Sequence, residues 1–464
     1  MLIACLAGCM SSGPNYKSPQ TAVAGSFGNA PASAASPDEK MLGVWWKGFH
    51  DAKLDSLIEH AIKNNHDLRI ATANLKEARA LRQLKTFDLA PTVTANSGYT
   101  NTLISRAAAP AGASRDAREA QLFDAGFDAS WELDLFGRVR RSVKAANADV
   151  EAFEATRFDV LVSVISEVAR NYFELHGLQN QLAVARKNAE VQKDTLKLNE
   201  SRLQGGRGTE FDVERSRSLL NLTLASIPPL EGAIQKTIYR ISVLMGEQPL
   251  ALKAELSNPE LLPSVLPEIA IGDPAALLRR RPDIRAAERS LASTTEKIGI
   301  ATADLFPRVT FVGSMSVQAD TFSGLTKGAG AYNFGPRITW AALDLGRVRS
   351  RIKAAHIRAE AALASYERTV LAALEETEGA LVDFGEEKSK EQFLEASSQA
   401  AQKAADLARQ RYDAGSADYL SVLDAQRTLL EAQDRLAASQ TRTVTSLVAV
   451  YKALGGYATV KEVR

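Results

Sequence analysis

Four segments of the chain alternate between apolar and polar residues, the pattern typical of a β-strand with two different faces. In residues 123–134 every odd position is apolar and every even position is polar or glycine. Residues 309–318 and 332–342 alternate in the same way, and residues 93–99 indicate a weaker fourth strand. Lengths of roughly nine to twelve residues suit tilted strands that cross a membrane. We therefore predict two β-hairpins with one face towards lipid and the other towards water.

Two tryptophans, Trp131 and Trp340, lie near the ends of these predicted strands, where interfacial aromatic residues of membrane barrels belong. A soluble sheet packed on helices would alternate similarly, but the loops at 102–121 and 319–331 are polar and rich in Gly and Ala, like external barrel loops. One chain's strands would leave two open edges, which hydrocarbon does not tolerate. The pattern therefore demands an oligomer, and it leaves open whether two or three chains close the barrel.

Long amphipathic helices are predicted between the strands, because apolar residues recur there every three or four positions. Residues 143–204 and 352–412 carry this pattern over about 60 residues, or roughly 90 Å of helix. Such lengths indicate coiled-coil packing. Return helices are expected over 210–246 and 418–455, and shorter helices over about 52–86 and 274–304.

A glycine-containing turn follows each long helix, where Gly supplies the left-handed backbone conformation. Within the first return helix, the pair Pro228-Pro229 is expected to interrupt the helix. The turn after the first long helix and the start of its return helix contain Gly205, Gly206, Gly208, Thr209 and Phe211. The turn after the second long helix and the start of its return helix contain Gly415, Ser416 and Asp418.

An internal duplication organises these elements, because residues 131–246 reappear 209 positions later at 340–455. Each copy is predicted to hold a helix, a β-hairpin, a long helix, a tight turn and a return helix. The predicted organisation is a signal peptide (1–8), an anchored extended segment (9–40), a first copy (41–256, hairpin about 91–134), a second copy (257–456, hairpin about 307–344) and a C-terminal tail (457–464).

Composition excludes several classes of function. The 56 basic and 55 acidic residues nearly balance, so no basic surface indicates nucleic acid. The five histidines are scattered and the two cysteines lie near the start, so no metal site or disulfide is predicted. Catalytic motifs are absent, and the glycines between 324 and 330 fit an external loop. We expect neither a cofactor nor an enzyme activity.

The first residues resemble a bacterial lipoprotein signal, in which Leu6-Ala-Gly precedes Cys9, the expected lipidation site. The apolar run is short and lacks a basic start, so an ordinary secretory signal is the alternative. An Asp directly after the lipidated cysteine retains a lipoprotein in the inner membrane. This chain has Met10 at that position, which favours the outer membrane. Residues 10–40 are rich in Ser, Ala, Gly and Pro, typical of an extended segment.

Residues 9–456 resemble the TolC-like outer-membrane efflux family, in its lipid-anchored branch typified by OprM and NodT. The motifs that carry the resemblance are the cysteine followed by Gly13-Pro-Asn-Tyr, the doubled Gly-Arg-Val-Arg at 137–140 and 346–349, and the segments 279–285 and 411–427. The resemblance implies a homotrimer whose strands form one transmembrane β-barrel, continued by a coiled-coil α-helical barrel. Its implied partners are outer-membrane lipid, a periplasmic adaptor and an inner-membrane pump, often of the resistance-nodulation-division class.

The resemblance also implies a periplasmic gate at Leu420, Asp424 and Arg427. Their spacing of four and three places them on one helical face, and symmetry would make each a ring. An ordinary exposed ion pair is the alternative interpretation. The first copy has Phe211 and Arg215 in the places of Leu420 and Asp424, and we expect the turn residues of the helix tips to contact the adaptor.

We therefore predict an outer-membrane, lipid-anchored exit duct that extends into the periplasm and passively conducts drugs or other small solutes. A duct for type I protein secretion is one alternative, against which the lipoprotein signal argues weakly. A lipid-anchored periplasmic coiled-coil scaffold is another, against which the doubled hairpin and the two-faced strands argue.

Overall fold

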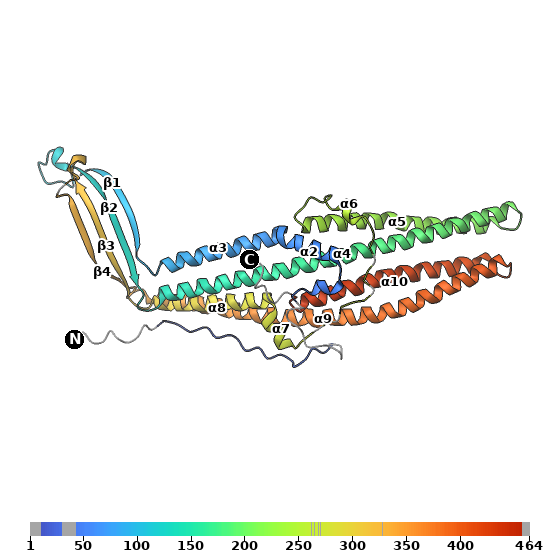
Figure 1. Cartoon of the computed structure of the whole chain (residues 1–464). Coiled ribbons are helices and arrows are strands. Elements are labelled where there is room, and N and C mark those ends of the chain that lie inside the picture. Colours follow the sequence, from blue (N-terminus) through green and yellow to red (C-terminus); the bar gives the residue numbers. More distant parts are fainter. Residues whose placement is uncertain are drawn as a thin grey trace. The chain divides into compact units, whose positions relative to one another are not determined.

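The computed structural model describes residues 11–29, 43–260, 262–263, 265–267, 269, 271–326 and 328–456 (Figure 1). The chain forms two compact units. The first holds the described residues up to Gln20 together with Asn74–Glu154 and Ala286–Arg368, and the second holds Thr21–Ala73, Ala155–Arg285 and the described residues from Thr369 onwards. No described helix is both long enough and apolar enough to span a membrane.

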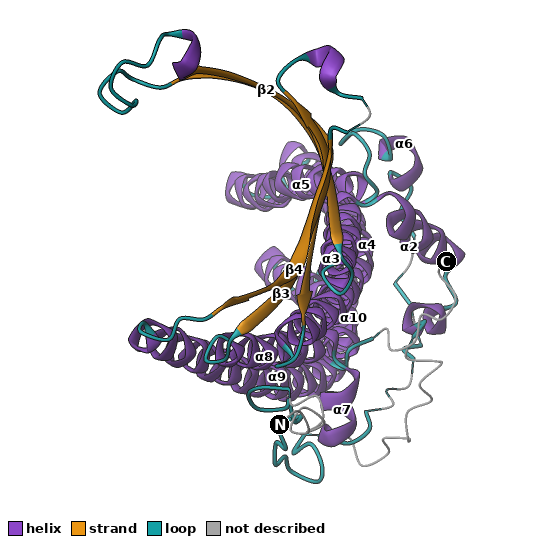
Figure 2. Ribbon diagram, turned by 90° about the vertical axis from the view of Figure 1, so that its left-hand side faces the viewer, coloured by secondary structure: helices purple, strands orange, loops and turns teal. Residues whose placement is uncertain are grey.

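A four-stranded antiparallel sheet belongs to the first unit, in the order β1-β2-β3-β4. Its strands are β1 (Thr92–Leu103), β2 (Glu119–Leu133), β3 (Arg308–Ala319) and β4 (Gly330–Thr339), with short 3-10 turns at Asp116–Arg118 and Phe322–Gly324. Both predicted hairpins are present, and β2 also pairs with β3. The sheet is strongly curved (Figure 2).

The predicted strand ends were wrong in two places. The strand expected to be weakest, β1, is twelve residues long, because all of Thr92–Leu103 pairs with β2. The strand expected over 332–342 ends at Thr339, so Trp340 lies just beyond it.

The two shorter helices were each predicted as one element, which was wrong, because each is divided by a single residue. The first consists of α2 (Ala52–Asn64) and α3 (His66–Phe87), and the second of α7 (Pro274–Arg280) and α8 (Pro282–Ala303). Asn65 leaves the helical conformation, and its side-chain oxygen accepts the N–H groups that start α3. Arg281 precedes Pro282, whose ring disfavours a helical conformation in the residue before it.

The long helices are α4 (Arg138–Gln204) and α9 (Leu345–Asp413), and both begin earlier than predicted. The return helices are α5 (Glu210–Leu244) and α10 (Tyr419–Ala453). The expected break at Pro228-Pro229 was wrong, because α5 continues through both prolines. Each proline removes one N–H from the helical ladder and crowds the carbonyl four residues earlier, but its fixed φ is close to the helical value, so the helix can continue.

The core of the second unit is built around a turn at Trp45–Phe49, α2, and the parts of α4, α5 and α10 beside them. Trp45 stacks on Tyr451 with ring centroids 5.0 Å apart, and Phe49 packs on Phe173 at 4.7 Å. The linker that follows α5 carries one further short helix, α6 (Lys253–Leu256). Burying each large side chain of this kind contributes about 1.5–3 kcal/mol, so this core fixes how the helices of the second unit pack.

Candidate functional site

The sheet has two chemically different faces, as the sequence predicted. Phe127 pairs with Met315, and Asp128 beside it pairs with Ser314. Directly paired residues of an antiparallel sheet share a face, so the register places apolar side chains together on one side and polar ones on the other. The apolar face carries Val93, Tyr99, Phe123, Phe127, Trp131, Phe311, Met315, Tyr332, Phe334 and Ile338.

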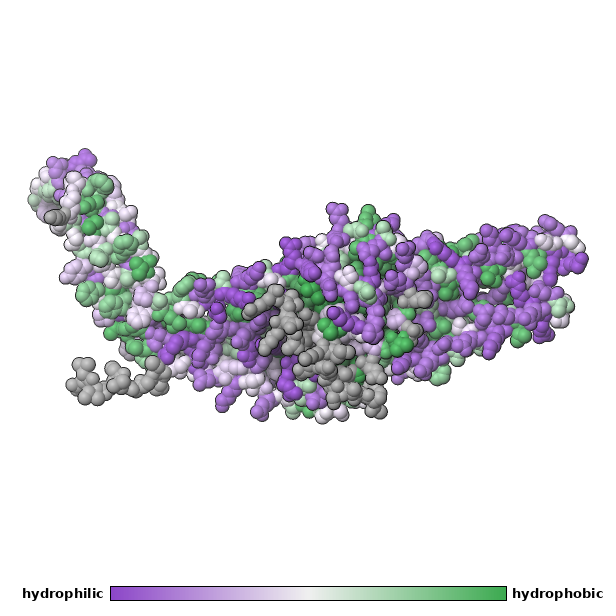
Figure 3. Space-filling model, viewed as in Figure 1, coloured by the Kyte–Doolittle hydropathy of each residue, from purple (hydrophilic) through white to green (hydrophobic). Residues whose placement is uncertain are grey.

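This apolar face is bare within the chain. Phe127 is 61% exposed and Phe334 is 68% exposed, and apolar atoms gather over the strands in Figure 3. The opposite face is polar and also uncovered, with Asn96 donating to Asp128 at 3.0 Å. Monomeric soluble proteins rarely leave a patch of this kind in water, so the apolar face needs another apolar surface against it.

The two predicted interfacial tryptophans make matching contacts at one end of the sheet. Trp131 donates from Nε1 to the carbonyl of Leu89 at 2.9 Å, and Trp340 donates to the carbonyl of Leu305 at 3.0 Å. Each indole therefore ties the end of a hairpin to the chain that enters the same hairpin. Both rings remain partly exposed, as amphipathic residues of a membrane interface do, and their contact with such an interface stays a prediction.

The two predicted turns at the helix tips share one geometry. Gly206 and Gly415 have φ of +71° and +73°, the left-handed conformation that favours glycine. In each turn the next residue donates its N–H to a carbonyl five residues earlier, at 2.8 Å and 2.9 Å. Thr209 and Asp418 then cap the return helices with their side-chain oxygens. The remaining predicted tip residues, Gly205, Gly208, Phe211 and Ser416, lie in or beside these turns.

The predicted gate residues lie on the exposed first turns of α10. Asp424 and Arg427 form an ion pair with 3.8 Å between Oδ1 and Nη2, and Arg427 also lies 3.9 Å from Glu431. Leu420 is half exposed. A solvent-exposed pair of this geometry contributes only about 0–1 kcal/mol. Within one chain these residues therefore close nothing, and a ring would need other copies of the chain.

Sequence reasoning missed a buried polar cluster beside the tips. Tyr412 donates from its hydroxyl to Oδ1 of Asn199 at 3.0 Å, and Asn199 donates from Nδ2 to Oγ of Ser216 at 2.7 Å. The hydroxyl groups of Ser216 and Tyr419 are hydrogen-bonded at 2.7 Å. These four residues come from α4, α5, α9 and α10, so the cluster joins the two helical hairpins of the second unit.

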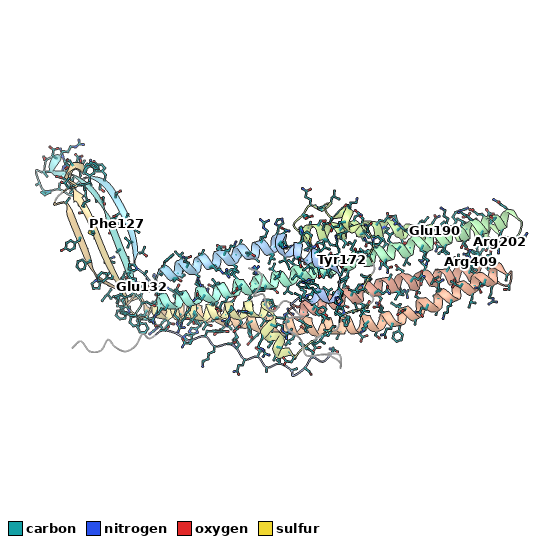
Figure 4. The ribbon with its side chains drawn as sticks, in the orientation of Figure 1. Phe127, Glu132, Tyr172, Glu190, Arg202 and Arg409 are labelled. Atoms are coloured by element: carbon teal, nitrogen blue, oxygen red, sulfur yellow. The ribbon has the colours of Figure 1, made fainter. Side chains whose placement is uncertain are left out.

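Aromatic and charged groups surround this cluster. The guanidinium of Arg202 lies 4.0 Å from the ring centroid of Tyr412, and its Nη2 lies 3.8 Å from a carboxylate oxygen of Asp413. Figure 4 labels Arg202 beside the turn that ends α4. Burial raises the pKa of Tyr419, so its hydroxyl stays protonated at neutral pH.

One sequence signal pointed to this cluster. Tyr412 and Tyr419 flank the second turn, whereas Leu203 and Glu210 stand 209 positions earlier around the first. The aromatic pair is thus specific to one turn, and it lies next to the predicted gate.

The family model described as "Outer membrane efflux protein" matches residues 57–247 and 274–456, well over half of the chain. The chain belongs to the outer membrane efflux protein family. The resemblance predicted from the sequence motifs is thereby confirmed.

Relatives in this family match along most of their length. The pyoverdine export outer membrane protein OpmQ of Pseudomonas aeruginosa is 32% identical over 431 residues, 91% of this chain and 89% of that protein. Nodulation protein T of Rhizobium leguminosarum bv. trifolii is 29% identical over 438 residues, 93% of this chain and 91% of its own. The solved outer-membrane channel OprN superposes with a TM-score of 0.89 at 40% identity, covering 96% of this chain and 99% of that one.

The efflux-family assignment supports an outer-membrane channel and not an enzyme. Among the described residues, no group of three or more His, Cys, Asp or Glu side chains is arranged to hold a metal ion. The predicted lipidation site, Cys9, lies outside the described residues.

Proposed function

We propose that three copies of this chain form a passive exit duct through the outer membrane for solutes delivered by an efflux pump. The observation that carries the proposal is the sheet, which has one bare apolar face, one bare polar face and two edge strands, β1 and β4, that pair on only one side within the chain. Closing the sheet with copies of itself satisfies both edges, turns the apolar face to lipid and leaves the polar face to line a water-filled pore.

In this proposal three copies supply twelve strands, four from each chain. Long α-helices continue the duct into the periplasm, where a periplasmic adaptor contacts the tips and an inner-membrane pump, of the resistance-nodulation-division class, feeds it. Cys9 carries the lipid anchor in the outer membrane. The solutes are drugs or other small molecules, and the duct itself performs no chemistry on them.

The gate in this proposal is the ring formed by Leu420, Asp424 and Arg427 of each copy. Threefold symmetry brings each residue close to its two equivalents if α10 faces the axis at its start. A ring of Leu420 side chains excludes water, and Asp424 meets a guanidinium of a neighbouring copy in a charge-assisted hydrogen bond. The exposure of all three side chains in the single chain leaves them free for these contacts.

Two substitutions in neighbouring positions of β2 test which face meets lipid. Phe127→Arg places a charge on the apolar face, and Asp128→Arg places the same charge on the polar face. An arginine facing the middle of the bilayer costs about 2–4 kcal/mol. We expect purified Phe127→Arg protein to form no channels in planar bilayers, whereas Asp128→Arg protein forms channels as often as the native protein. Equal channel formation by both variants would contradict the proposal, because a soluble sheet tolerates an arginine at exposed Phe127.

A further inference from the structure

The apolar face of the sheet becomes polar near the connection between β1 and β2. Residues two apart on a strand share a face, so Gln121 and Glu119 lie on the same side of β2 as Phe123. Asn101 of β1 pairs with Gln121 and therefore shares this side. Between Trp131 and Phe123 the face is apolar, whereas beyond Phe123 it carries these three polar side chains beside Leu103.

The first hairpin extends past this change. The pairing of β2 with β3 ends at Phe123 and Ala319, but β1 and β2 stay paired for four more residues, as far as Leu103 and Glu119. Trp131 and Phe123 are eight positions apart, or about 26 Å along the strand. The apolar band of a membrane barrel is about 25 Å tall. In the proposed duct, the end of this hairpin therefore projects beyond the hydrocarbon (Figure 1).

Three aromatic rings mark the boundary between the apolar and the polar part of this face. The rings of Tyr99 and Phe123 have centroids 4.7 Å apart, and Phe322, from the turn between β3 and β4, packs edge-on against Phe123 at 6.0 Å. Tyr99 is 55% exposed and Phe322 is 75% exposed. The rings therefore offer an apolar surface to a molecule outside the chain, at the level where membrane barrels carry an aromatic girdle.

Four polar residues lie next to these rings, Asn101, Arg115, Glu119 and Gln121, which we name the polar ledge. Asn101 donates from Nδ2 to Oε1 of Glu119 at 3.0 Å. Nε of Arg115 lies 3.9 Å from Oε2 of Glu119, which places the guanidinium beside the ledge. The Arg115 side chain is 74% exposed, and so loose an exposed ion pair contributes only about 0–1 kcal/mol. The guanidinium is thus able to bind a further anion.

The connection that carries Arg115 is cationic. Residues 104–118 contain three arginines and one aspartate, a formal charge of +2, whereas residues 320–329, which connect β3 to β4, contain one aspartate and one lysine. The polar face of β2 is acidic, with Asp124 and Asp128. Attraction for an anion is therefore concentrated at the tip of the first hairpin, on the side of the apolar face.

This combination of groups suits a phosphorylated sugar attached to a lipid. Aromatic rings pack against the C–H face of a sugar, and amide and carboxylate groups form hydrogen bonds with its hydroxyl groups. A guanidinium binds phosphate with two parallel N–H groups. The outer leaflet of a bacterial outer membrane presents such a headgroup, the phosphorylated glucosamines of lipid A, just beyond the hydrocarbon.

We propose that the polar ledge and the rings of Tyr99, Phe123 and Phe322 bind the headgroup of lipid A, the glycolipid part of lipopolysaccharide. The sugar packs on the rings, Asn101, Glu119 and Gln121 bind its hydroxyl groups, and Arg115 binds a phosphate. The acyl chains lie along the apolar face below Phe123. The proposal rests on the outer-membrane barrel proposed above.

Titration of the purified full-length protein with lipopolysaccharide truncated to lipid A and its innermost sugars tests the ledge, with native mass spectrometry as the readout. We expect Asn101→Ala combined with Gln121→Ala to weaken binding at least fivefold. Asn96→Ala on the polar face of β1 is the matched control and should bind like the native protein. Native affinity in the double variant would show that the acyl chains alone hold the lipid, and would overturn the proposal.

A second comparison tests the phosphate contact. Arg115→Gln should weaken binding of the phosphorylated lipid at least threefold and leave binding of the phosphatase-treated lipid unchanged. Equal weakening for both lipids, or no weakening for either, would overturn the role of Arg115. These side chains are exposed in the chain, so the substitutions leave the fold intact.

The source of the sugar is tested with the soluble core oligosaccharide released from the same lipopolysaccharide. It should bind at least a hundredfold more weakly than the intact lipid, because it lacks the acyl chains and the lipid A sugars. Comparable affinity would assign the ledge to a soluble saccharide and overturn the lipid.

These assays do not require channel activity, so they separate the ledge from the duct. Protein that forms channels in planar bilayers, but whose ledge variants bind lipopolysaccharide like the native protein, would refute the ledge and keep the duct. Protein that binds the lipid through the ledge but forms no channels would refute the duct and keep the ledge.

Discussion

The hydroxyl of Tyr412 on α9 donates a 3.0 Å hydrogen bond to the side-chain oxygen of Asn199 on α4, and this contact joins the tips of two helical hairpins. Asn199 is buried, and its amide nitrogen also donates to Ser216, so its side chain cannot turn to form a different hydrogen bond. A buried hydrogen bond of this kind contributes about 1 kcal/mol net, and losing one partner costs about 1–3 kcal/mol. The cluster therefore contributes to holding the tips of the two hairpins of this chain together.

Removing the Tyr412 hydroxyl should weaken the contact between the tips of the two helical hairpins. We expect Tyr412→Phe to raise the mean single-channel conductance in planar bilayers at least twofold, because Asn199 then lacks its donor. Tyr239→Phe removes a phenolic hydroxyl near the other end of α5 and should leave conductance unchanged. If the Tyr412 and Tyr239 variants conduct like the native protein, the cluster is structural and takes no part in opening.

The predicted gate ring leads to a separate expectation. Replacing Asp424 and Arg427 together by Ala should raise single-channel conductance severalfold, since the inter-chain contacts proposed to close the pore are lost. The control is Asp194→Ala with Lys197→Ala, which removes an exposed ion pair of the same spacing from α4. Unchanged conductance in the Asp424/Arg427 variant would make that pair an ordinary surface contact and reject the gate.

Asp159 should make the second unit sensitive to pH. Burial raises the pKa of this carboxyl, with Asp283 adding to the shift and Arg281 and Lys452 opposing it. The folded state therefore holds the proton more tightly than the unfolded state, and stability falls as pH rises through the window above the unfolded pKa.

The Asp159→Asn variant should remove this dependence. We expect its melting temperature to exceed the native value by about 2 °C or more at pH 7.5, with the difference shrinking as the pH is lowered towards 4. A variant that is less stable than the native protein at pH 7.5 would show that the carboxylate is stabilised by its two cations instead.

The lipid anchor can be tested directly at Cys9. In cells fed a palmitate analogue, Cys9→Ser should abolish labelling of the protein, whereas Cys5→Ser should leave it unchanged because that cysteine lies in the expected signal peptide. Labelling that survives in the Cys9 variant would place the modification at another residue.

The faces of the sheet were predictable because apolar and polar residues alternate along each strand, and successive residues of a strand point to opposite faces. Phe127 and Asp128 fall on opposite faces whatever the register, and pairing only decides which strands lie beside them. The long helices were predictable for a similar reason, since their apolar spacing persists over many turns. The break at Arg281 was also signalled, by the proline that follows it, and was missed.

The contacts between distant segments were not predictable. Asn199 and Tyr412 are separated by 213 residues, and nothing in the spacing around either of them indicates the other. The docking of Ser12 beside Phe136 is of the same kind, because it depends on how α4 and α8 pack. The proposed gate illustrates a further limit, since the closing role proposed for Leu420 and Arg427 requires other copies of the chain, which a single sequence does not place.

Single-particle imaging of the detergent-purified native protein tests the central claim most directly. We expect threefold particles with a central channel, one barrel built from the sheets of three chains, and a particle length well over 100 Å, since each long helix alone accounts for roughly 100 Å at 1.5 Å per residue. A monomeric particle, or a short particle without a central channel, would contradict the exit duct.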